Sequence, residues 1–356
     1  NDAGYDSGVV KVNSYGTGTF DITSEATLEP SDKVTYQLWM WLDNNADNSA
    51  QGKEYKSKIV VTSYDREQKT AVDTLLAKVN PEDLDYNSAT DTQKKEMWTF
   101  SHPETVQTEA LTDYRYIGAD PNNYVTFNNE TWRIIGVFTV DDGTGKKEER
   151  LKIIRNESIG NMAWNSNNTN DWSNATLNAN LNSGDYWTNI LSDNAKSMIG
   201  DTLWYLGGTS NYTSSTNGLT SHFYSYERGT TVYSGRDTSW VGKVGLMYPS
   251  DYGYATSGGS TTDRNACLNK ELYNWDSSDF SDCTNNDWIF NSSHQWTITP
   301  CASNSNSVFF VRITESFDYI GARMIYIGVR PVVFLKSNIK IVDGDGSSSN
   351  PYILQS

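Results

Sequence analysis

The sequence is short of positive charge. It carries 28 Lys and Arg residues against 44 Asp and Glu residues, which gives a formal net charge of −16 over 356 residues. Phosphate groups are bound by clustered Lys and Arg side chains. The charge balance therefore argues against nucleic acid as a partner, and the length suits two or three domains.

Long apolar runs are absent as well. No run approaches the length of a membrane-spanning helix, and no signal peptide is recognisable at the start of the chain. The sequence begins as a trimmed extracellular domain would. We therefore expect a protein of the cell surface or the extracellular space, with any membrane anchor outside this chain.

Cysteine and histidine are scarce, with three of each. Their spacing matches no zinc-binding pattern, so we expect no metal site built from them. Cys267 and Cys283 are close enough in sequence to form a local disulfide across a surface loop, as an oxidising compartment allows. A pair of free buried thiols is the alternative. Cys301 is then left unpaired.

Aromatic residues are plentiful, at 13% of the chain with 22 Tyr and 12 Trp. This content is typical of binding surfaces, where Tyr gives contact area at a low entropic cost. It is also typical of a rigid core beneath long loops. The composition leaves both interpretations open.

Residues 1–72 alternate apolar and polar side chains between Gly, Pro, Asn and Asp turns, which predicts an all-β, immunoglobulin-like sandwich domain. Within it, "DNNADNSAQGKE" places oxygen-bearing side chains at the spacing of a calcium loop: Asp43, Asn45, Asp47, Ser49, Gln51 and Glu54. However, Asn48 stands where such loops have Gly, and the flanking segments read as strands. A solvated hairpin is the preferred interpretation, so calcium is possible but has no clear motif.

Residues 73–112 read as a polar connector with one short helix in "AVDTLLAKV", ordered chiefly where Trp98 and Phe100 dock. A second domain is expected over residues 113–356. It begins with a strand pair in "NYVTFNNETWRIIGVFTV", which turns at Asn128 and Asn129, and continues with a strand in "ERLKIIRN".

Helical periodicity follows over residues 171–199. Asp171 or Ser173 is the expected cap of the first helix, and Ser192 or Asp193 of the second. The segment from there to residue 295 is mostly irregular and rich in Gly, Ser, Tyr and Trp.

The stretch "VFFVRITESFDYIGARMIYIGVRPVVFL", residues 308–335, starts and ends as buried strands. Its middle mixes large apolar, aromatic and charged side chains with no regular period. Burying unpaired charge is costly, so we expect the middle to be exposed, although ordinary core is the alternative. Arg330 beside Pro331 is expected to be structural, paired with an interior carboxylate or with carbonyl groups.

Five segments in order carry a family resemblance: "FNNETWRIIGVF", "NDWSNATLNANLN", "GLMYPSDYGYA", "NNDWIFNSSHQWTITP" and "SVFFV … GVRPVVFLKSNIKIVDGDGSSSNPYIL". They resemble bacterial surface proteins with a C-type-lectin fold, of the subgroup related to the formylglycine-generating enzyme. In some relatives the last segment is the variable region of a diversity-generating retroelement. The resemblance covers residues 113–356 and implies an α+β lectin-like head. The strands of residues 1–72 resemble companion domains of Gram-positive surface proteins.

The resemblance further implies that residues 301–327 form a variable, ligand-binding face. Retroelement mutagenesis replaces adenines, often in asparagine codons, so the variable positions should carry the residues that such changes produce. The side chains that fit such changes, together with Arg312, make up the expected ligand-binding set: Cys301, Ser303, Ser305, Ser307, Arg312, Ile313, Thr314, Phe317, Asp318, Tyr319, Ile320, Arg323, Ile325, Tyr326 and Ile327. Glu315 and Met324 do not fit an asparagine codon.

Catalytic motifs are missing: the sequence has no nucleophile elbow, zinc-protease motif, phosphate-binding loop or dinucleotide fingerprint. The formylglycine-generating relatives use a reactive cysteine pair, and Cys301 has no partner nearby in sequence. His294, seven residues earlier, is the one histidine close to it. We therefore expect a binding protein and not an enzyme, with no catalytic residues and no cofactor.

The expected partner is a protein or cell-surface ligand, as for an adhesin. A carbohydrate ligand is the first alternative, although the sugar-binding triplets of calcium-type lectins are absent. A structural surface subunit and an enzyme of the formylglycine-generating type are less favoured alternatives.

Overall fold

The computed structural model describes residues 48–50, 52, 69–314 and 316–356, and divides the chain into two units, Asn1–Asp65 and Arg66–Ser356. The sandwich expected over residues 1–72 lies outside the described residues, except for its last few. Of the calcium-loop segment, only a 3-10 turn, η1 (Asn48–Ala50), and residue 52 are described. The second unit begins at Arg66, a few residues before the expected boundary, and contains every strand of the described residues.

The largest element of the second unit is a nine-stranded mixed sheet, whose main path runs β13-β14-β3-β4-β5-β12-β8. β2 pairs with β4 beside this path and β1 pairs with β2. The strands are β1 (Met97–His102), β2 (Leu111–Tyr116), β3 (Tyr124–Phe127), β4 (Glu130–Asp141), β5 (Lys147–Arg155), β8 (Val244–Gly245), β12 (Val332–Phe334), β13 (Lys340–Asp343) and β14 (Tyr352–Gln355). The pairing of β14 with β3 is parallel, whereas the other pairings in this sheet are antiparallel.

The centre of this sheet follows directly from the sequence. β3 and β4 form the expected hairpin, and Asn128 and Asn129 take positive φ angles of 55° and 58°, which suit a two-residue turn. The middle of β4 is buried without alternation because both faces of the sheet are covered. Gly136 lies at an irregularity in the β4–β5 register, where an added Cβ would meet the Tyr114 carbonyl of β2.

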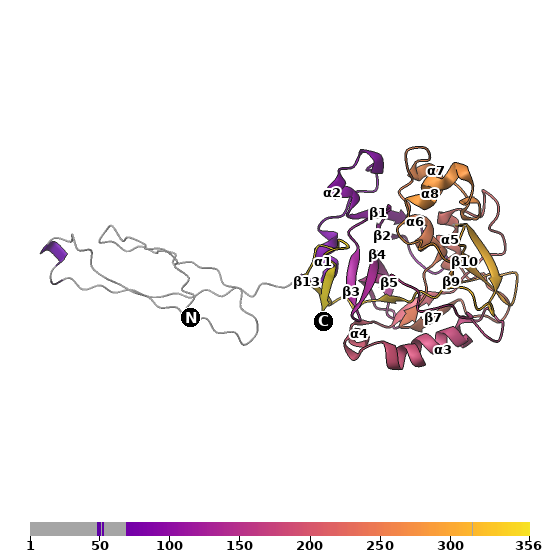
Figure 1. The fold of residues 1–356 in the computed structure, drawn as a ribbon. Coiled ribbons are helices and arrows are strands. Elements are labelled where there is room, and N and C mark those ends of the chain that lie inside the picture. Colours follow the sequence, from indigo (N-terminus) through magenta and orange to yellow (C-terminus); the bar gives the residue numbers. More distant parts are fainter. Residues whose placement is uncertain (1–47, 51, 53–68, 315) are drawn as a thin grey trace. The chain divides into compact units, whose positions relative to one another are not determined.

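Two smaller sheets complete the strands of this unit. One is antiparallel in the order β11-β10-β9, with β9 (Gln295–Pro300), β10 (Ser307–Val311) and β11 (Phe317–Gly321). The other pairs β6 (Thr202–Tyr205) with β7 (Ser239–Gly242). Figure 1 shows β9 and β10 near α5 and α6, away from β3 and β13.

The helices are short. They are α1 (Ala71–Leu76), α2 (Asp91–Lys94), α3 (Thr176–Asn182), α4 (Asp193–Met198), α5 (Thr220–Glu227), α6 (Pro249–Tyr254), α7 (Arg264–Leu268) and α8 (Ser281–Asn285). Single turns occur at η2 (Tyr86–Ser88), η3 (Trp172–Asn174), η5 (Leu272–Asn274) and η6 (Ser278–Phe280), and η4 (Tyr186–Ile190) is a π-helical turn. The second unit is therefore a mixed α/β structure with several sheets and few helices.

The helix caps were predicted in part. Ser192 caps α4 as expected, since its hydroxyl accepts a hydrogen bond of 3.1 Å from the Ala195 N–H. The expected caps at Asp171 and Ser173 were wrong. Asp171 precedes η3 without a side-chain capping bond, and α3 starts after Ala175, which has no capping side chain.

The segment 73–112 is more ordered than the connector expected from the sequence. It contains most of α1, which carries a complete capping box between Thr70 and Asp73, together with α2 and β1. Leu75 and Met97 belong to the main apolar core, and Trp98 and Phe100 belong to a second core cluster. The segment is thus part of the second unit, because its apolar side chains pack against the large sheet.

Candidate functional site

The frame of the candidate site is the small sheet β9–β10–β11. Every residue of β9 and β10 is buried, which confirms that Val308–Val311 is a core strand. β12 and Leu335 are buried as well, which confirms the second core strand at the end of residues 308–335. Between them the Arg312 N–H donates to the Ser316 carbonyl oxygen at 2.8 Å, and the chain returns as β11, antiparallel to β10 and at the edge of the sheet.

β11 was not expected, since its sequence shows no strand period. Phe317 is fully buried, whereas Tyr319 keeps 40% of its surface exposed, although both lie on the same side of the strand. The packing explains the difference. Phe317 lies opposite Val311, and its ring is covered by the rings of Phe309 and Phe223. Tyr319 lies opposite Phe309, and its ring meets those of Phe309 and Tyr212 edge-on.

The structure divides the fifteen expected ligand-binding residues into three groups. Four are buried, and a ligand in contact with them would have to enter the core: Cys301, Ser307, Phe317 and Ile327. Their assignment to a binding surface is corrected, because their side chains fill space between strands. Four are partly buried: Ser305, Arg312, Asp318 and Ile320. Seven are exposed: Ser303, Ile313, Thr314, Tyr319, Arg323, Ile325 and Tyr326.

We refer to the eleven exposed and partly buried residues as the 303–326 face. Three exposed apolar side chains stand out in it beside Tyr319. They are Ile313 at 54%, Ile325 at 72% and Tyr326 at 49% of their surface. Glu315 lies outside the described residues.

Tyr212 supports one end of the 303–326 face, and sequence reasoning missed it. Its hydroxyl donates a hydrogen bond of 2.7 Å to Asp318 Oδ1, and its ring meets that of Tyr319 edge-on at 5.5 Å. Tyr273 meets Tyr212 from the other side at 5.7 Å. Burial and the Asp318 carboxylate both raise the pKa of Tyr212, so it remains a hydrogen-bond donor. Arg312 lies 3.7 Å from the second Asp318 oxygen.

His294 supports the other end. Its Nδ1 accepts a hydrogen bond of 3.1 Å from the Ile313 N–H, and its ring lies 6.0 Å from that of Tyr326. Burial, and to a smaller extent Arg312, lowers the pKa of His294, so the neutral ring that can accept this bond is favoured. The histidine thus fixes the backbone at Ile313 and is not directed to Cys301 through this nitrogen.

Asn170 fixes the loop of residues 301–307. Its side-chain amide donates to the carbonyl oxygens of Cys301 at 2.9 Å and Asn304 at 2.7 Å, and Arg236 Nε donates to its amide oxygen at 3.2 Å. The backbone under Ser303 and Ser305 is therefore held by bonds from Asn170, and the Ser303 hydroxyl adds a contact with the Cys301 sulfur.

Cys301 is a free, buried thiol, 1% exposed, with its sulfur 3.5 Å from the Ser303 hydroxyl. Reactive thiols are partly exposed and lie in electropositive surroundings. Cys301 has neither the exposure nor a cysteine partner, because the other two cysteines are joined to each other. The geometry gives it a packing role.

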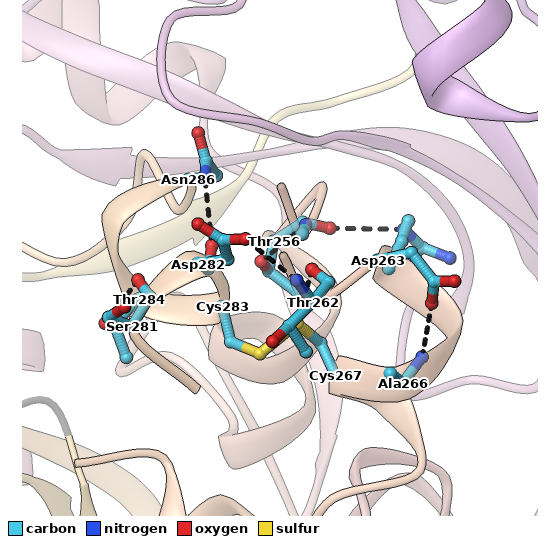
Figure 2. The surroundings of a disulfide bond; sticks show 12 residues. Thr256, Thr262, Asp263, Ala266, Cys267, Ser281, Asp282, Cys283, Thr284 and Asn286 are labelled. Carbon is cyan, nitrogen blue, oxygen red and sulfur yellow. Dashed lines mark hydrogen bonds between the residues drawn. A yellow bond between two sulfur atoms is a disulfide. The ribbon is translucent and has the colours of Figure 1, made fainter. Parts of the chain in front are cut away.

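The disulfide between Cys267 and Cys283 is present, with the two Cα atoms 5.5 Å apart. Figure 2 shows that it joins α7 to α8 beneath the loop of residues 256–262, where Asp282 accepts hydrogen bonds from the Thr261 and Thr262 N–H groups. Both cysteines are fully buried, and the bond closes the segment between them, of which residues 276–279 are exposed, as predicted.

A buried network of charges lies between strands of the large sheet and α6, and no pattern in the sequence predicts it. Arg115 donates to Asp113 at 2.8 Å and to Asp251 at 3.1 Å, and Lys152 bonds the other Asp251 oxygen. His102 Nε2 lies 3.0 Å from Asp113. Each of these five side chains is at least 95% buried.

The pKa values in this network follow from burial and pairing. Burial acts to raise the pKa values of Asp113 and Asp251, but the adjacent cations outweigh it and hold both below the usual range. Burial lowers the pKa of Lys152 and of His102. The network joins β2 and β5 to α6. Because its members are not accessible, it holds the frame and does not contact a ligand.

Glu227 extends the buried polar core. It accepts hydrogen bonds from the Ser250 N–H at 2.8 Å and the Ser250 hydroxyl at 2.6 Å, and Arg228 lies 3.1 Å away. Burial raises the pKa of Glu227 to about 7, against the opposing effect of Arg228. Glu227 therefore changes its protonation state near neutral pH.

Arg330 has the structural role expected from the sequence. Its guanidinium donates to the carbonyl oxygens of Arg155, at 2.7 Å, and Ile289, and to the side chain of Gln295 at 3.1 Å. Burial lowers its pKa to about 9. These bonds tie the closing strand to β5 and β9.

In the described ranges, no cluster of three or more His, Cys, Asp or Glu side chains is placed to hold a metal ion. Among the helices described, none has the length and apolar character needed to cross a bilayer. Comparison of the chain with protein-family models, with curated protein sequences and with solved structures found no match in any of the three.

Proposed function

We propose that the chain is an extracellular, non-enzymatic binding protein, of the adhesin or receptor-binding type, which contacts a protein or cell-surface ligand through the 303–326 face. The second unit would be a C-type-lectin-like head of the formylglycine-generating-enzyme subgroup, and residues 1–72 an immunoglobulin-like companion. The face would be a region diversified by a retroelement.

The observation that carries the proposal is the concentration of exposed apolar side chains. Eleven large apolar residues of the described chain are exposed, and four of them fall within residues 313–326. Clustered exposed aromatic and aliphatic side chains are typical of interaction sites, because burying them against a partner releases water from apolar surface.

The support of the face is the second argument. His294 and Asn170 hold the backbone under it through hydrogen bonds to the Ile313 N–H and the Cys301 carbonyl oxygen. Tyr212 bonds the Asp318 side chain. A backbone already fixed loses little conformational freedom on binding. The exposed side chains can therefore vary without disturbing the frame, as a diversified region requires.

An extracellular location agrees with the Cys267–Cys283 disulfide, since such bonds persist in oxidising compartments.

The coding DNA provides the direct test of diversification. We expect a near-copy of the segment encoding residues 300–332 beside the gene, differing only at adenines, with a reverse transcriptase gene close by. Absence of such a copy from the complete genome would reject diversification and leave a fixed binding face.

Binding is tested with the double variant Ile325→Ser and Tyr326→Ser, by flow cytometry of the labelled chain on intact cells. We expect the double variant to lose cell binding while its thermal unfolding is unchanged. Val106→Ser is the matched control, because Val106 is 74% exposed but lies outside the face. Equal losses in both variants would contradict the proposed face.

A glycan ligand is the second candidate, favoured by the cluster of Tyr212, Tyr273 and Tyr319. Aromatic rings at a partly exposed site can stack on a sugar. A glycan array distinguishes the two ligands. A glycan hit that Tyr273→Ala abolishes and Ile325→Ser preserves would favour the sugar over the protein ligand.

A further inference from the structure

A small cavity of about 170 Å³ lies away from the 303–326 face, between β1, the turn at η2 and α7. Its side walls are aromatic, and they come from Tyr86, Trp98, Phe100 and Tyr254. An apolar cavity of about 150 Å³ holds one benzene ring. The dimensions therefore suit a ligand with a single ring or a short branched chain.

Arg264, the first residue of α7, lines this cavity. Its Nε donates to the Thr256 carbonyl oxygen at 3.1 Å, and its guanidinium carbon lies 4.6 Å from the centre of the Phe100 ring. Its Nη2 is buried without a hydrogen-bond partner, and no carboxylate of the described residues forms an ion pair with it. Burial lowers the pKa of Arg264 to about 10.

Trp98 supplies a second unused donor. It is 4% exposed and its indole Nε1 is buried with no hydrogen-bond partner. Buried polar groups are almost always hydrogen-bonded, so two unpaired donors on side chains that line one cavity need an explanation. The missing partner is an acceptor, and opposite a guanidinium the favoured acceptor is an anion.

Glu82 limits which anions fit. It also lines the cavity, and its Oε1 accepts a hydrogen bond of 3.0 Å from the Ser101 N–H. It is not within ion-pair distance of Arg264, but its charge acts on Arg264 through space. A second negative charge on the ligand would be repelled by Glu82. A single carboxylate is therefore favoured over a phosphate.

We propose that this cavity binds a small monocarboxylate with an aromatic or aliphatic body. The carboxylate accepts from Arg264 Nη2, Trp98 Nε1 is the second donor available to it, and the apolar body packs between the aromatic walls. The site is independent of the 303–326 face, so either proposal can fail without the other.

The disulfide holds this site together. Cys267 lies on α7 between Arg264 and Leu268, both of which line the cavity, and its bond to Cys283 joins α7 to α8 (Figure 2). Asp263 caps the same helix by accepting a hydrogen bond of 2.7 Å from the Ala266 N–H. Reduction of the disulfide is therefore expected to weaken carboxylate binding as well as stability.

The test is calorimetric titration of the full chain with phenylacetate, and with phenethylamine as a cation of similar shape. We expect saturable binding of phenylacetate and none of phenethylamine. Hydrogen bonds to charged groups predict that Arg264→Met weakens phenylacetate binding about 10- to 100-fold. Arg264→Lys should retain part of the affinity, and Trp98→Phe should weaken binding several-fold while keeping an aromatic wall.

Arg323→Met is the matched control, because Arg323 is an exposed arginine of the 303–326 face. It should leave phenylacetate binding unchanged. Absence of binding to the unmodified chain, equal binding of phenethylamine, or unchanged affinity in Arg264→Met would each overturn the proposal. If Arg264→Met does not fold, the comparison of phenylacetate with phenethylamine on the unmodified chain decides.

Discussion

The ring of Phe317 stacks on the ring of Phe309, with centroids 5.2 Å apart and planes inclined by 14°. Phe223 meets Phe317 edge-on at 4.9 Å. This contact joins the edge strand β11 to the core. Phe317 therefore holds β11 in place, whereas Tyr319 of the same strand stays exposed and can contact a ligand.

Truncating Phe317 should therefore be costly. We expect Phe317→Ala to lower the free energy of unfolding by about 3–5 kcal/mol, the usual cost of removing a buried phenyl ring. Ile325→Ala should change it by less than about 0.5 kcal/mol, because Ile325 is exposed. Urea unfolding curves measure both. Similar values for the two variants would mean that the assignment of core and face is wrong.

Removing the disulfide should lower stability measurably. The bond spans 16 residues, and loops of this length predict a loss of about 3 kcal/mol in the free energy of unfolding. The variant carrying Cys267→Ser and Cys283→Ser tests this by urea unfolding. Cys301→Ser is the control for replacing a buried cysteine without breaking a bond. An equal loss in the control would argue against a contribution from the disulfide.

The buried ion pair of Lys152 and Asp251 gives a third prediction. Lys152→Met should lower the free energy of unfolding by about 3–5 kcal/mol, since it leaves the Asp251 carboxylate with one buried cation fewer. Lys243→Met is the matched control. Lys243 pairs with Asp201 near the surface, and such pairs contribute about 0–1 kcal/mol. A small loss of unfolding free energy in Lys152→Met would show that Arg115 alone suffices to balance the charge of the Asp251 carboxylate.

Glu227 and His102 should have opposite effects on how the free energy of unfolding depends on pH. Burial raises the pKa of Glu227 from 4.5 to about 7. Its contribution to stability is therefore present below pH 4.5 and is lost as the pH rises through 7. Burial lowers the pKa of His102 below 6.5, so its contribution is present above 6.5 and is lost as the pH falls.

The two effects oppose each other between pH 4.5 and 7, the range set by Glu227. Glu227→Gln should make the free energy of unfolding rise more steeply with pH across this range. His102→Asn should make it fall more steeply. Unfolding midpoints in urea at several pH values measure the slopes. An unchanged slope in Glu227→Gln would place the titrating group elsewhere.

The parts of the fold predicted from the sequence are the local ones. The β3–β4 hairpin and β5 depend on apolar strands joined by a two-residue Asn turn, and all of that information lies within about thirty residues. Ser192 was recognised as a cap for the same reason. Cys267 and Cys283 lie near each other in the chain, so their pairing could also be anticipated.

The features that were missed depend on contacts between distant residues. Arg115 and Asp251 are 136 residues apart, and nothing in the sequence around either one indicates the other. Within the candidate site, Phe317 is buried and Tyr319 is exposed because the ring of Phe223, from the distant helix α5, covers Phe317. His294, which accepts a hydrogen bond from the Ile313 N–H, also lies outside residues 308–335.

The disulfide also has a consequence for proteolysis. Residues 276–279 are exposed and form the outer part of the loop between the two cysteines. Peptide bonds in exposed loops are the ones that proteases cut first. A cut in this loop would leave the two fragments joined by the sulfur–sulfur bond, so the nicked molecule would separate on a gel only after reduction.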